Sequence, residues 1–252
     1  MSKPIIAITR PSERAKIAND LVEKLGGEPY LAPTLELRPI NSPSLKKLVN
    51  KKYELDWIVF TSPTTIKAIY QFYPDFLEDL SCKIAAIGRK TAEVVDDYNL
   101  YVDLIPKDFT AEGLLEEFKK RDIQNQVIGI PRTVSARNTL PEGLKELNNK
   151  VIIAEAYESL IPENIAKIKE LIAKICSGEI DAITFTSPLT VENLLRIAEN
   201  NEEIASKLSD EILTVAIGPI TSNVLDSYNI KNIYPDRYTV KDMLELVMEE
   251  LE

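Results

Sequence analysis

The chain has 252 residues, of which 44% are apolar, so it can build one large or two ordinary domains with buried cores. Its formal net charge is −10 and its basic residues form no visible cluster, which argues against a nucleic-acid surface. The absence of histidine removes the commonest general base, proton shuttle and metal ligand, so any chemistry must proceed without imidazole.

No membrane segment, metal site or cofactor cradle is indicated. The N-terminal MSKPIIAITR lacks the apolar core of a signal peptide, and no apolar run approaches the roughly 20 residues of a membrane span, so we expect a cytoplasmic location and no membrane partner. Cys82 and Cys176 lie far apart and form no metal-binding spacing, so both are expected to be buried thiols. The chain has only eight glycines and no Gly-rich phosphate loop, so no nucleotide or flavin cofactor is expected.

The chain begins with a strand followed by a helix. Ile5 to Ile8 is a short β-branched run, and the apolar residues between Ala15 and Leu25 follow helical spacing until Gly26 and Gly27 end the pattern. Residues 28–40 contain three prolines that no helix would accept, which predicts a second strand, a linker, or both. A polar helix is expected from Ser44 to about residue 52.

A motif, FTSPxT, then occurs twice, in residues 56–69 (DWIVFTSPTTIKAI) and in residues 181–195 (DAITFTSPLTVENLL). Each copy lies between a buried apolar run and a helical pattern. Ser62 and Ser187 are favourable N-cap residues, and the proline after each suits the first helical position, which needs no N–H. Each copy therefore predicts a short buried strand, a turn and a helix.

Further repeats show that the whole chain is a duplication. Residues 83–118 match residues 213–247, with the AIG turn at Gly88 and Gly218 and with Thr91 opposite Thr221. The N-terminal IAITRPSERA can be laid on IGIPRTVSAR, which aligns Arg10 with Arg132. Each half thus offers about five strands alternating with helices, the pattern of an open parallel sheet. We expect an α/β protein with two flavodoxin-like parallel-sheet domains.

In such sheets ligands bind beyond the carboxyl ends of the strands, where helix N-termini present free N–H groups. The FTSP turns, the AIG turns and the turns at Arg10 and Arg132 all fall at these ends. Each motif taken alone also fits a purely structural role, since Ser-Pro caps helices and glycine makes tight turns. Asp56 and Asp181 precede strands, at the opposite end of the sheet, and are expected to be structural.

Taken together, these residues resemble the uroporphyrinogen-III synthase family over essentially the whole chain. The motifs that carry the resemblance are the N-terminal ITRP turn, the segment from Phe185 to Pro188 with Val191, AEAYES around Tyr157, and AIGPITS at residues 216–222. Ile220 departs from the small or hydroxylated residue that many members carry, which puts direct substrate contact at that position in doubt.

The resemblance implies interleaved domains. Residues 1–35 and 162–252 would form one domain and residues 41–152 the other, with residues 36–40 and 153–161 as a two-stranded extended connector. The cleft between the domains would hold the substrate. A monomer is expected.

The resemblance also implies the reaction and its residues. The substrate would be hydroxymethylbilane, which loses its hydroxyl as water and closes to uroporphyrinogen III with the terminal ring inverted; an azafulvene and a spiro intermediate would intervene. Tyr157 would assist departure of the hydroxyl, although an interdomain packing role is the alternative. Substrate carboxylates would be bound by a set of basic residues and helix-start residues: Arg10, Thr61, Ser62, Arg89, Arg132, Arg137, Thr186, Ser187, Gly218 and Thr221. The alternative function is a two-domain binding or regulatory protein for a small anionic ligand.

Overall fold

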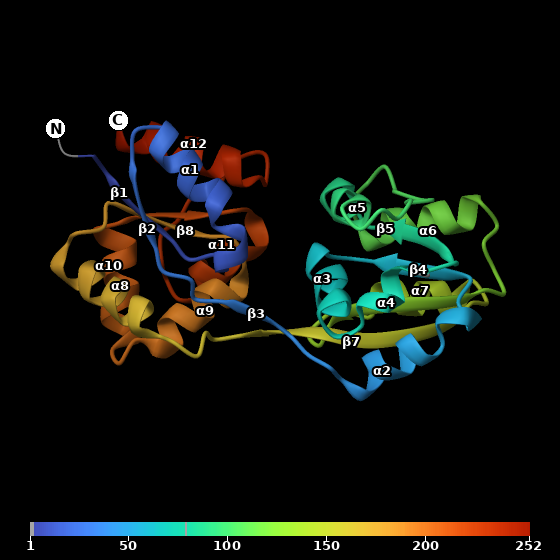
Figure 1. Ribbon diagram of the computed structural model, residues 1–252. Coiled ribbons are helices and arrows are strands. Elements are labelled where there is room, and N and C mark those ends of the chain that lie inside the picture. Colours follow the sequence, from blue (N-terminus) through green and yellow to red (C-terminus); the bar gives the residue numbers. More distant parts are fainter. Residues whose placement is uncertain (1–2, 79) are drawn as a thin grey trace. The chain divides into compact units, whose positions relative to one another are not determined.

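The structure is a computed structural model that describes residues 3–78 and 80–252. The chain divides into two compact units, which we call the first and the second unit (Figure 1). The first unit comprises Met1–Glu36 and Leu160–Glu252, and the second comprises Leu37–Ser159. The first unit is therefore built from two separate stretches of chain, and the second is inserted between them.

The first unit is a parallel sheet with helices on both faces. Its strands are β1 (Ile5–Ile8), β2 (Glu28–Leu31), β8 (Ala182–Phe185) and β9 (Leu213–Ala216), in the order β2-β1-β8-β9, with every paired neighbour parallel. Its helices are α1 (Lys16–Lys24), α8 (Ala166–Ser177), α9 (Pro188–Ile197), α10 (Asn201–Asp210), α11 (Pro219–Ser227) and α12 (Val240–Leu251), with a 3-10 turn at Ser12–Arg14.

The second unit repeats this plan and adds one edge strand. Its strands are β3 (Glu36–Pro39), β4 (Trp57–Phe60), β5 (Lys83–Ala86), β6 (Val127–Thr133) and β7 (Lys150–Leu160), in the order β3-β7-β6-β4-β5. The pairs from β7 to β5 are parallel. Its helices are α2 (Pro43–Asn50), α3 (Pro63–Phe72), α4 (Pro74–Glu78), α5 (Arg89–Asp96), α6 (Ala111–Lys120) and α7 (Thr139–Glu146), with a 3-10 turn at Lys52–Glu54.

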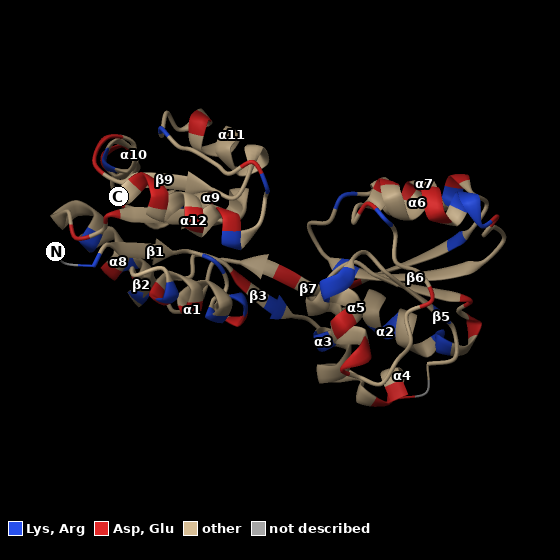
Figure 2. Cartoon of the chain, turned by 90° about the horizontal axis from the view of Figure 1, so that it is seen from above, with Lys and Arg blue, Asp and Glu red and all other residues tan. Residues whose placement is uncertain are grey.

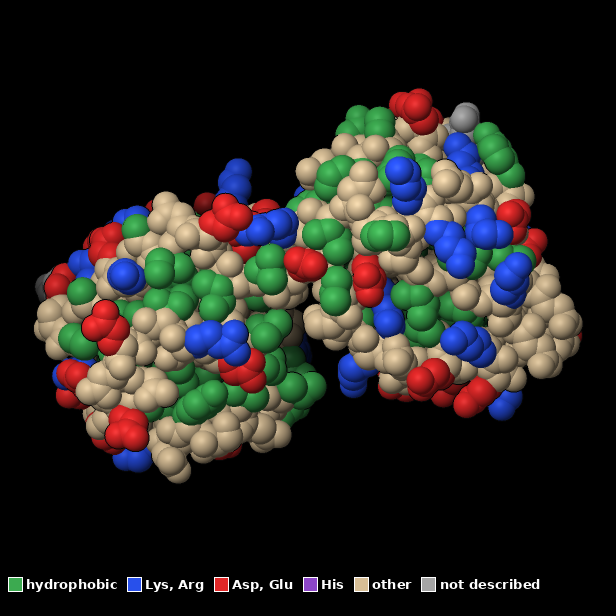
Figure 3. Space-filling view, turned by 90° about the horizontal axis from the view of Figure 1, so that it is seen from below, with side chains coloured by type: hydrophobic (Ala, Val, Ile, Leu, Met, Phe, Trp, Pro, Cys, Tyr) green, Lys and Arg blue, Asp and Glu red, His purple; other side chains and the backbone are tan. Residues whose placement is uncertain are grey.

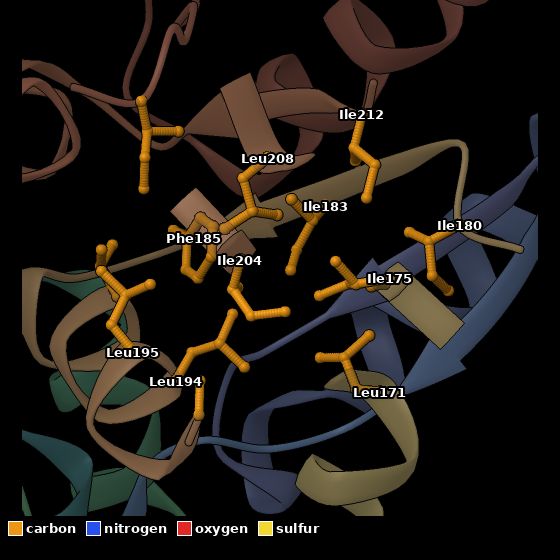
Figure 4. Close-up of a cluster of buried hydrophobic side chains, with 14 of the residues drawn as sticks. Leu171, Ile175, Ile180, Ile183, Phe185, Leu194, Leu195, Ile204, Leu208 and Ile212 are labelled. Atoms are coloured by element: carbon orange, nitrogen blue, oxygen red, sulfur yellow. The ribbon is translucent and has the colours of Figure 1, made fainter. Parts of the chain in front are cut away.

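Alternation along the strands builds a separate core on each face of each sheet. In β1, Ile6 and Ile8 pack with the residues of α1 and α12, whereas Ala7 packs with those of α8 to α11 on the other face. Figure 4 shows the second of these layers, in which Ile183 and Phe185 of β8 meet leucines and isoleucines of α8, α9 and α10. Because both faces are covered, the inner strands β1 and β4 are apolar throughout, as is typical of parallel sheets.

The expectation of two parallel-sheet α/β domains is confirmed, but the fifth strand of each half is much reduced. It is an isolated parallel bridge, between Val215 and Ile233 in the first unit and between Ala85 and Leu104 in the second. The Pro-rich residues 28–40 form two strands, β2 and β3, in different sheets. Both are edge strands, where a proline removes no ladder hydrogen bond that the sheet needs.

Two aspartates accept equivalent hydrogen bonds from residues at the starts of strands. The carboxylate of Asp181 accepts a hydrogen bond from the N–H of Ile5 at 2.7 Å, and that of Asp56 accepts one from Val127 at the same distance. Both aspartates are therefore structural, as the sequence indicated. The cysteines differ from expectation: Cys82 is half-buried, but Cys176 is exposed because it lies on the outer face of α8.

Charged side chains of both signs are interspersed over the helices of each unit (Figure 2). The face in Figure 3 likewise shows basic, acidic and apolar side chains side by side within each unit. In the described part of the chain, no helix combines the length and the apolar character that crossing a bilayer requires.

Candidate functional site

In each unit the FTSP turn and the AIG turn lie next to each other. The N–H of Ile87 donates to the C=O of Phe60 at 2.9 Å in the second unit, and the N–H of Ile217 donates to Phe185 at 2.9 Å in the first. These bonds extend the strand pairing by one residue at the carboxyl end of the sheet. The two helix N-termini that follow, α3 with α5 and α9 with α11, are thereby brought to the same edge.

A cavity of about 160 Å³ lies at this edge of the second unit. Three of the predicted binding residues line it, namely Thr61, Arg132 and Arg137. Its remaining wall includes Ile87, Ile130 and Leu140, and one carboxylate, Glu112. Because drug-sized ligands occupy roughly 300–1,000 Å³, this cavity suits a fragment such as one carboxylate arm or one pyrrole.

The Arg132 side chain is held by hydrogen bonds to its own loop. Its Nη1 donates to the backbone C=O of Arg137 and its Nη2 to Oδ1 of Asn138, each at 2.9 Å, so the guanidinium holds the loop after β6. Its Nε is buried and has no hydrogen-bond partner among the described residues. A buried donor without a partner is costly, so this nitrogen is available for an acceptor on a ligand.

In the first unit, five predicted residues occupy the equivalent positions. Arg10 follows β1, Thr186 and Ser187 follow β8, and Gly218 and Thr221 begin α11 after β9. Ser187 stands at the N-cap of α9, but its side chain accepts no hydrogen bond from the helix, and its Oγ is buried and unpartnered among the described residues. The sequence was therefore right about the position of this serine and wrong about its capping role.

Arg10 resembles Arg132 in having a buried Nε that no described residue satisfies. Burial lowers the pKa of the Arg10 guanidinium from its ordinary value, and the positive charge of Arg14 lowers it further. Both effects disfavour the charge, so an anion near Arg10 would relieve them. What the aligned residues Arg10 and Arg132 share in the structure is the buried Nε without a partner among the described residues.

A buried polar network that the sequence analysis missed supports Arg10 and Ser187. The Thr9 hydroxyl donates to the C=O of Thr184 at 2.8 Å, the Thr34 hydroxyl donates to Thr190 at 2.8 Å, and the Asn193 amide donates to the C=O of Thr34 at 2.8 Å. All five residues are buried. The hydrogen-bond partners are between 156 and 175 residues apart, so no spacing in the sequence indicates the network. The one signal in the sequence is Asn193, which interrupts the apolar face of α9.

Tyr157 lies on β7, where the pairing with β6 changes register. Arg132 pairs with Glu155 but Thr133 pairs with Tyr157, so one residue of β7 is skipped. Such bulges re-aim side chains and often adjoin active sites. The Tyr157 residue is 8% exposed. Tyr157 is not among the residues that line the cavity with Arg132.

Two serines that were not predicted hold the strand that carries Tyr157. The Ser42 hydroxyl donates to the C=O of Glu155 at 2.6 Å, and the Ser44 hydroxyl accepts from the N–H of Glu155 at 2.9 Å. Ser42 also caps α2 by accepting from Leu45 at 3.0 Å. Both backbone groups of Glu155 are thus satisfied by side chains, which fixes β7 two residues before the tyrosine.

The remaining predicted residues, Ser62 and Arg89, begin helices. Ser62 caps α3 by accepting from the N–H of Thr64 at 3.2 Å. Arg89 is exposed at the start of α5, and its guanidinium carbon lies 5.8 Å from the centre of the Phe109 ring. Neither residue lines the cavity. Among the described residues, no three His, Cys, Asp or Glu side chains are grouped so that they could hold a metal ion.

Comparisons with known proteins identify the family. The family model for uroporphyrinogen-III synthase HemD matches residues 16–245. A protein of Methanothermobacter thermautotrophicus named "Putative uroporphyrinogen-III synthase" is 41% identical, with 95% of each chain covered. A protein of Chlorobaculum parvum named "Uroporphyrinogen-III synthase" is 29% identical, with 98% of each chain covered.

Among solved structures, the uroporphyrinogen-III synthetase of Helicobacter pylori is similar with a TM-score of 0.70 at 14% identity, covering 99% of this chain and 100% of that one. A mutant uroporphyrinogen III synthase of Thermus thermophilus is similar with a TM-score of 0.64 at 20% identity, covering 98% of each chain. At these identities the structural likeness establishes the fold.

Proposed function

Because the chain belongs to the uroporphyrinogen-III synthase family, and so is a hydro-lyase that converts hydroxymethylbilane to uroporphyrinogen III, we propose that Tyr157 is its catalytic acid and that the carboxyl ends of its strands bind the substrate. The observation that carries the proposal is the position of Tyr157: the residue is only 8% exposed and lies where the register between β6 and β7 changes. A phenol O–H can donate a hydrogen bond to a departing oxygen.

In the proposed reaction, the phenol donates to the hydroxyl oxygen of the substrate while the carbon–oxygen bond breaks. Water leaves, and the terminal pyrrole becomes an azafulvene. The substituted carbon of the far ring attacks it to give the spiro intermediate, which opens and recloses with that ring inverted. The free position of the inverted ring loses a proton in the last step, which restores the phenol, so water is the only by-product.

The substrate carries an acetate and a propionate on each of its four pyrroles. We propose that they are bound by the guanidinium groups of Arg10 and Arg132, by the Arg137 side chain, and by free N–H groups at the helix starts after Ser62, Ser187 and Gly218. The unpartnered Nε atoms of Arg10 and Arg132 support this assignment. Thr61, Thr186 and Thr221 would add hydroxyl groups at the same edges, and Arg89 would act from the start of α5.

The test is conversion of freshly prepared hydroxymethylbilane by the purified chain, with no added cofactor or metal. Spontaneous closure gives isomer I, so the products are oxidised, esterified and separated by chromatography to measure isomer III. Formation of isomer III in proportion to the protein is expected, and EDTA should not reduce it. Isomer I alone at saturating protein would rule out synthase activity and leave a binding or regulatory role.

We further propose that a single chain is the active species. Sedimentation at the assay concentration should give the mass of one chain, 28.4 kDa. Activity per chain that rises with protein concentration would contradict this proposal.

A further inference from the structure

In each unit an exposed aromatic side chain lies against the glycine of the AIG turn. A Cβ placed on Gly88 would come within 3.2 Å of Cβ and Cγ of Phe109. A Cβ placed on Gly218 would come within 3.0 Å of Cγ and Cδ1 of Tyr238. Such distances are shorter than ordinary carbon contacts, so the absence of a side chain at each glycine is what lets the ring approach.

Both aromatic residues remain substantially exposed. Phe109 is 51% exposed and Tyr238 is 59% exposed, although each is held at its base by the glycine contact. Each ring directly precedes a threonine that caps the next helix: Thr110 accepts from Gly113 at 3.0 Å, and Thr239 accepts from Asp242 at 3.1 Å. The backbone at each ring is therefore fixed, while the ring itself presents apolar surface to solvent.

A structural explanation of the rings is a hydrophobic staple, in which the residue before the cap packs on the fourth residue of the helix. The fourth residues, Leu114 and Met243, are already buried, at 0% and 1% exposure. Although these fourth residues are covered, Phe109 and Tyr238 themselves stay 51% and 59% exposed. The duplication has therefore kept an exposed aromatic residue at the same place in both halves.

Polar groups for an anion accompany each ring. Thr91 and Thr221, in the first turns of α5 and α11, are each 3% exposed. Near Phe109 stands the guanidinium of Arg89, at 5.8 Å. Near Tyr238 stands Tyr234, with ring centres 6.4 Å apart at 64°. An apolar ring beside such groups matches a pyrrole with its carboxylate arms.

We propose that Phe109 and Tyr238 are positioning residues that pack against pyrrole rings of the substrate, while the adjacent helix starts bind carboxylate arms. This inference rests on the proposed function. The two aromatic side chains would recognise the pyrrole rings of the substrate rather than the charge of its carboxylates. A pyrrole is an electron-rich aromatic ring, so offset or edge contacts with Phe109 and Tyr238 are favourable.

The test compares Phe109→Ala and Tyr238→Ala with the native chain. KM and kcat are measured with hydroxymethylbilane, the Kd with uroporphyrin III as a stable probe, and the Tm by circular dichroism. Each substitution should raise KM and Kd by roughly three- to tenfold, the loss expected for one aromatic contact. Tyr238→Phe keeps the ring and should restore both values to within about twofold.

Matched controls are Tyr53→Ala in the second unit and Tyr228→Ala in the first, which remove exposed aromatic residues away from the glycine turns. They should leave KM unchanged. A lower Tm with unchanged KM and Kd in Phe109→Ala and Tyr238→Ala would establish the staple role and overturn the inference.

A second variant tests the glycine contact independently. Gly218→Ala should move the Tyr238 ring by a few tenths of an ångström and raise KM, and combining it with Tyr238→Ala should add little. Fully additive effects would contradict the inference. Absence of isomer III with the native chain would instead refute the proposed function, so the two failures can be distinguished.

Discussion

Ser62 and Ser187 begin equivalent helices after equivalent strands, but only Ser62 caps its helix. Its hydroxyl accepts from Thr64 at 3.2 Å, whereas Oγ of Ser187 is buried with no partner among the described residues. The two copies of the sequence are nearly identical here. The serine of the second unit therefore has a structural role, whereas the serine hydroxyl of the first unit is left for another partner.

We therefore expect opposite effects when the two serines are changed to alanine. Ser62→Ala should lower the free energy of unfolding by about 1 kcal/mol, the usual cost of losing an N-cap. Ser187→Ala should leave the stability nearly unchanged but raise KM for hydroxymethylbilane. Urea unfolding and initial rates measure the two quantities, and a destabilised Ser187→Ala chain with native KM would contradict the distinction.

Tyr157→Phe should lower kcat by roughly 10²- to 10⁴-fold, the usual contribution of a general acid, while the fold is retained because only a hydroxyl is lost. Tyr53→Phe, which changes an 81% exposed tyrosine, is the matched control and should be fully active. Full turnover by Tyr157→Phe would show that this residue serves packing alone.

The sequence predicted the fold well because its signals are local and occur twice. Serine-proline helix starts, AIG turns and continuous apolar strands each follow from neighbouring residues, and the duplication supported each assignment. The threonine network around Thr34 and the serines that hold Glu155 could not be predicted, since their partners lie more than 100 residues away. The failed cap at Ser187 also depends on side-chain rotation, which the motif does not encode.

The two cysteines should react at very different rates. Burial raises the pKa of the Cys82 thiol to about 12, whereas Cys176 is exposed. Because the thiolate is the nucleophile, at pH 8 the reactive fraction of Cys82 is about a thousandfold smaller than for a thiol of ordinary pKa. Mass spectrometry after brief treatment with iodoacetamide should show modification of Cys176 first, and a Cys176→Ser chain should react slowly. Rapid modification of Cys82 in the folded variant would contradict the burial.

We expect that replacing either Asp56 or Asp181 lowers the stability of the fold without changing catalysis. Asp56→Ala and Asp181→Ala each leave a strand-starting N–H without its charged acceptor, so each should cost about 2 kcal/mol. Both residues lie at the amino ends of the strands, away from the proposed site, so KM should stay within about twofold of the native value. A large change in KM with unchanged stability would assign these carboxylates a functional role instead.

The final prediction concerns salt, because an acidic chain of net charge −10 must bind a polyanion. Salt screens charge interactions over about 10 Å at 0.1 M. Screening lowers KM if repulsion between the acidic chain and the substrate dominates, and raises KM if attraction by the arginines dominates. If Arg132 binds a carboxylate directly, attraction dominates at contact and KM should rise with salt. Arg132→Gln should raise KM and make its salt dependence shallower. Arg196→Gln, which changes an exposed arginine in the last turn of α9, outside the proposed set, should leave the dependence unchanged. A KM that falls as salt increases would show that repulsion dominates and would remove the basic residues from the proposed site.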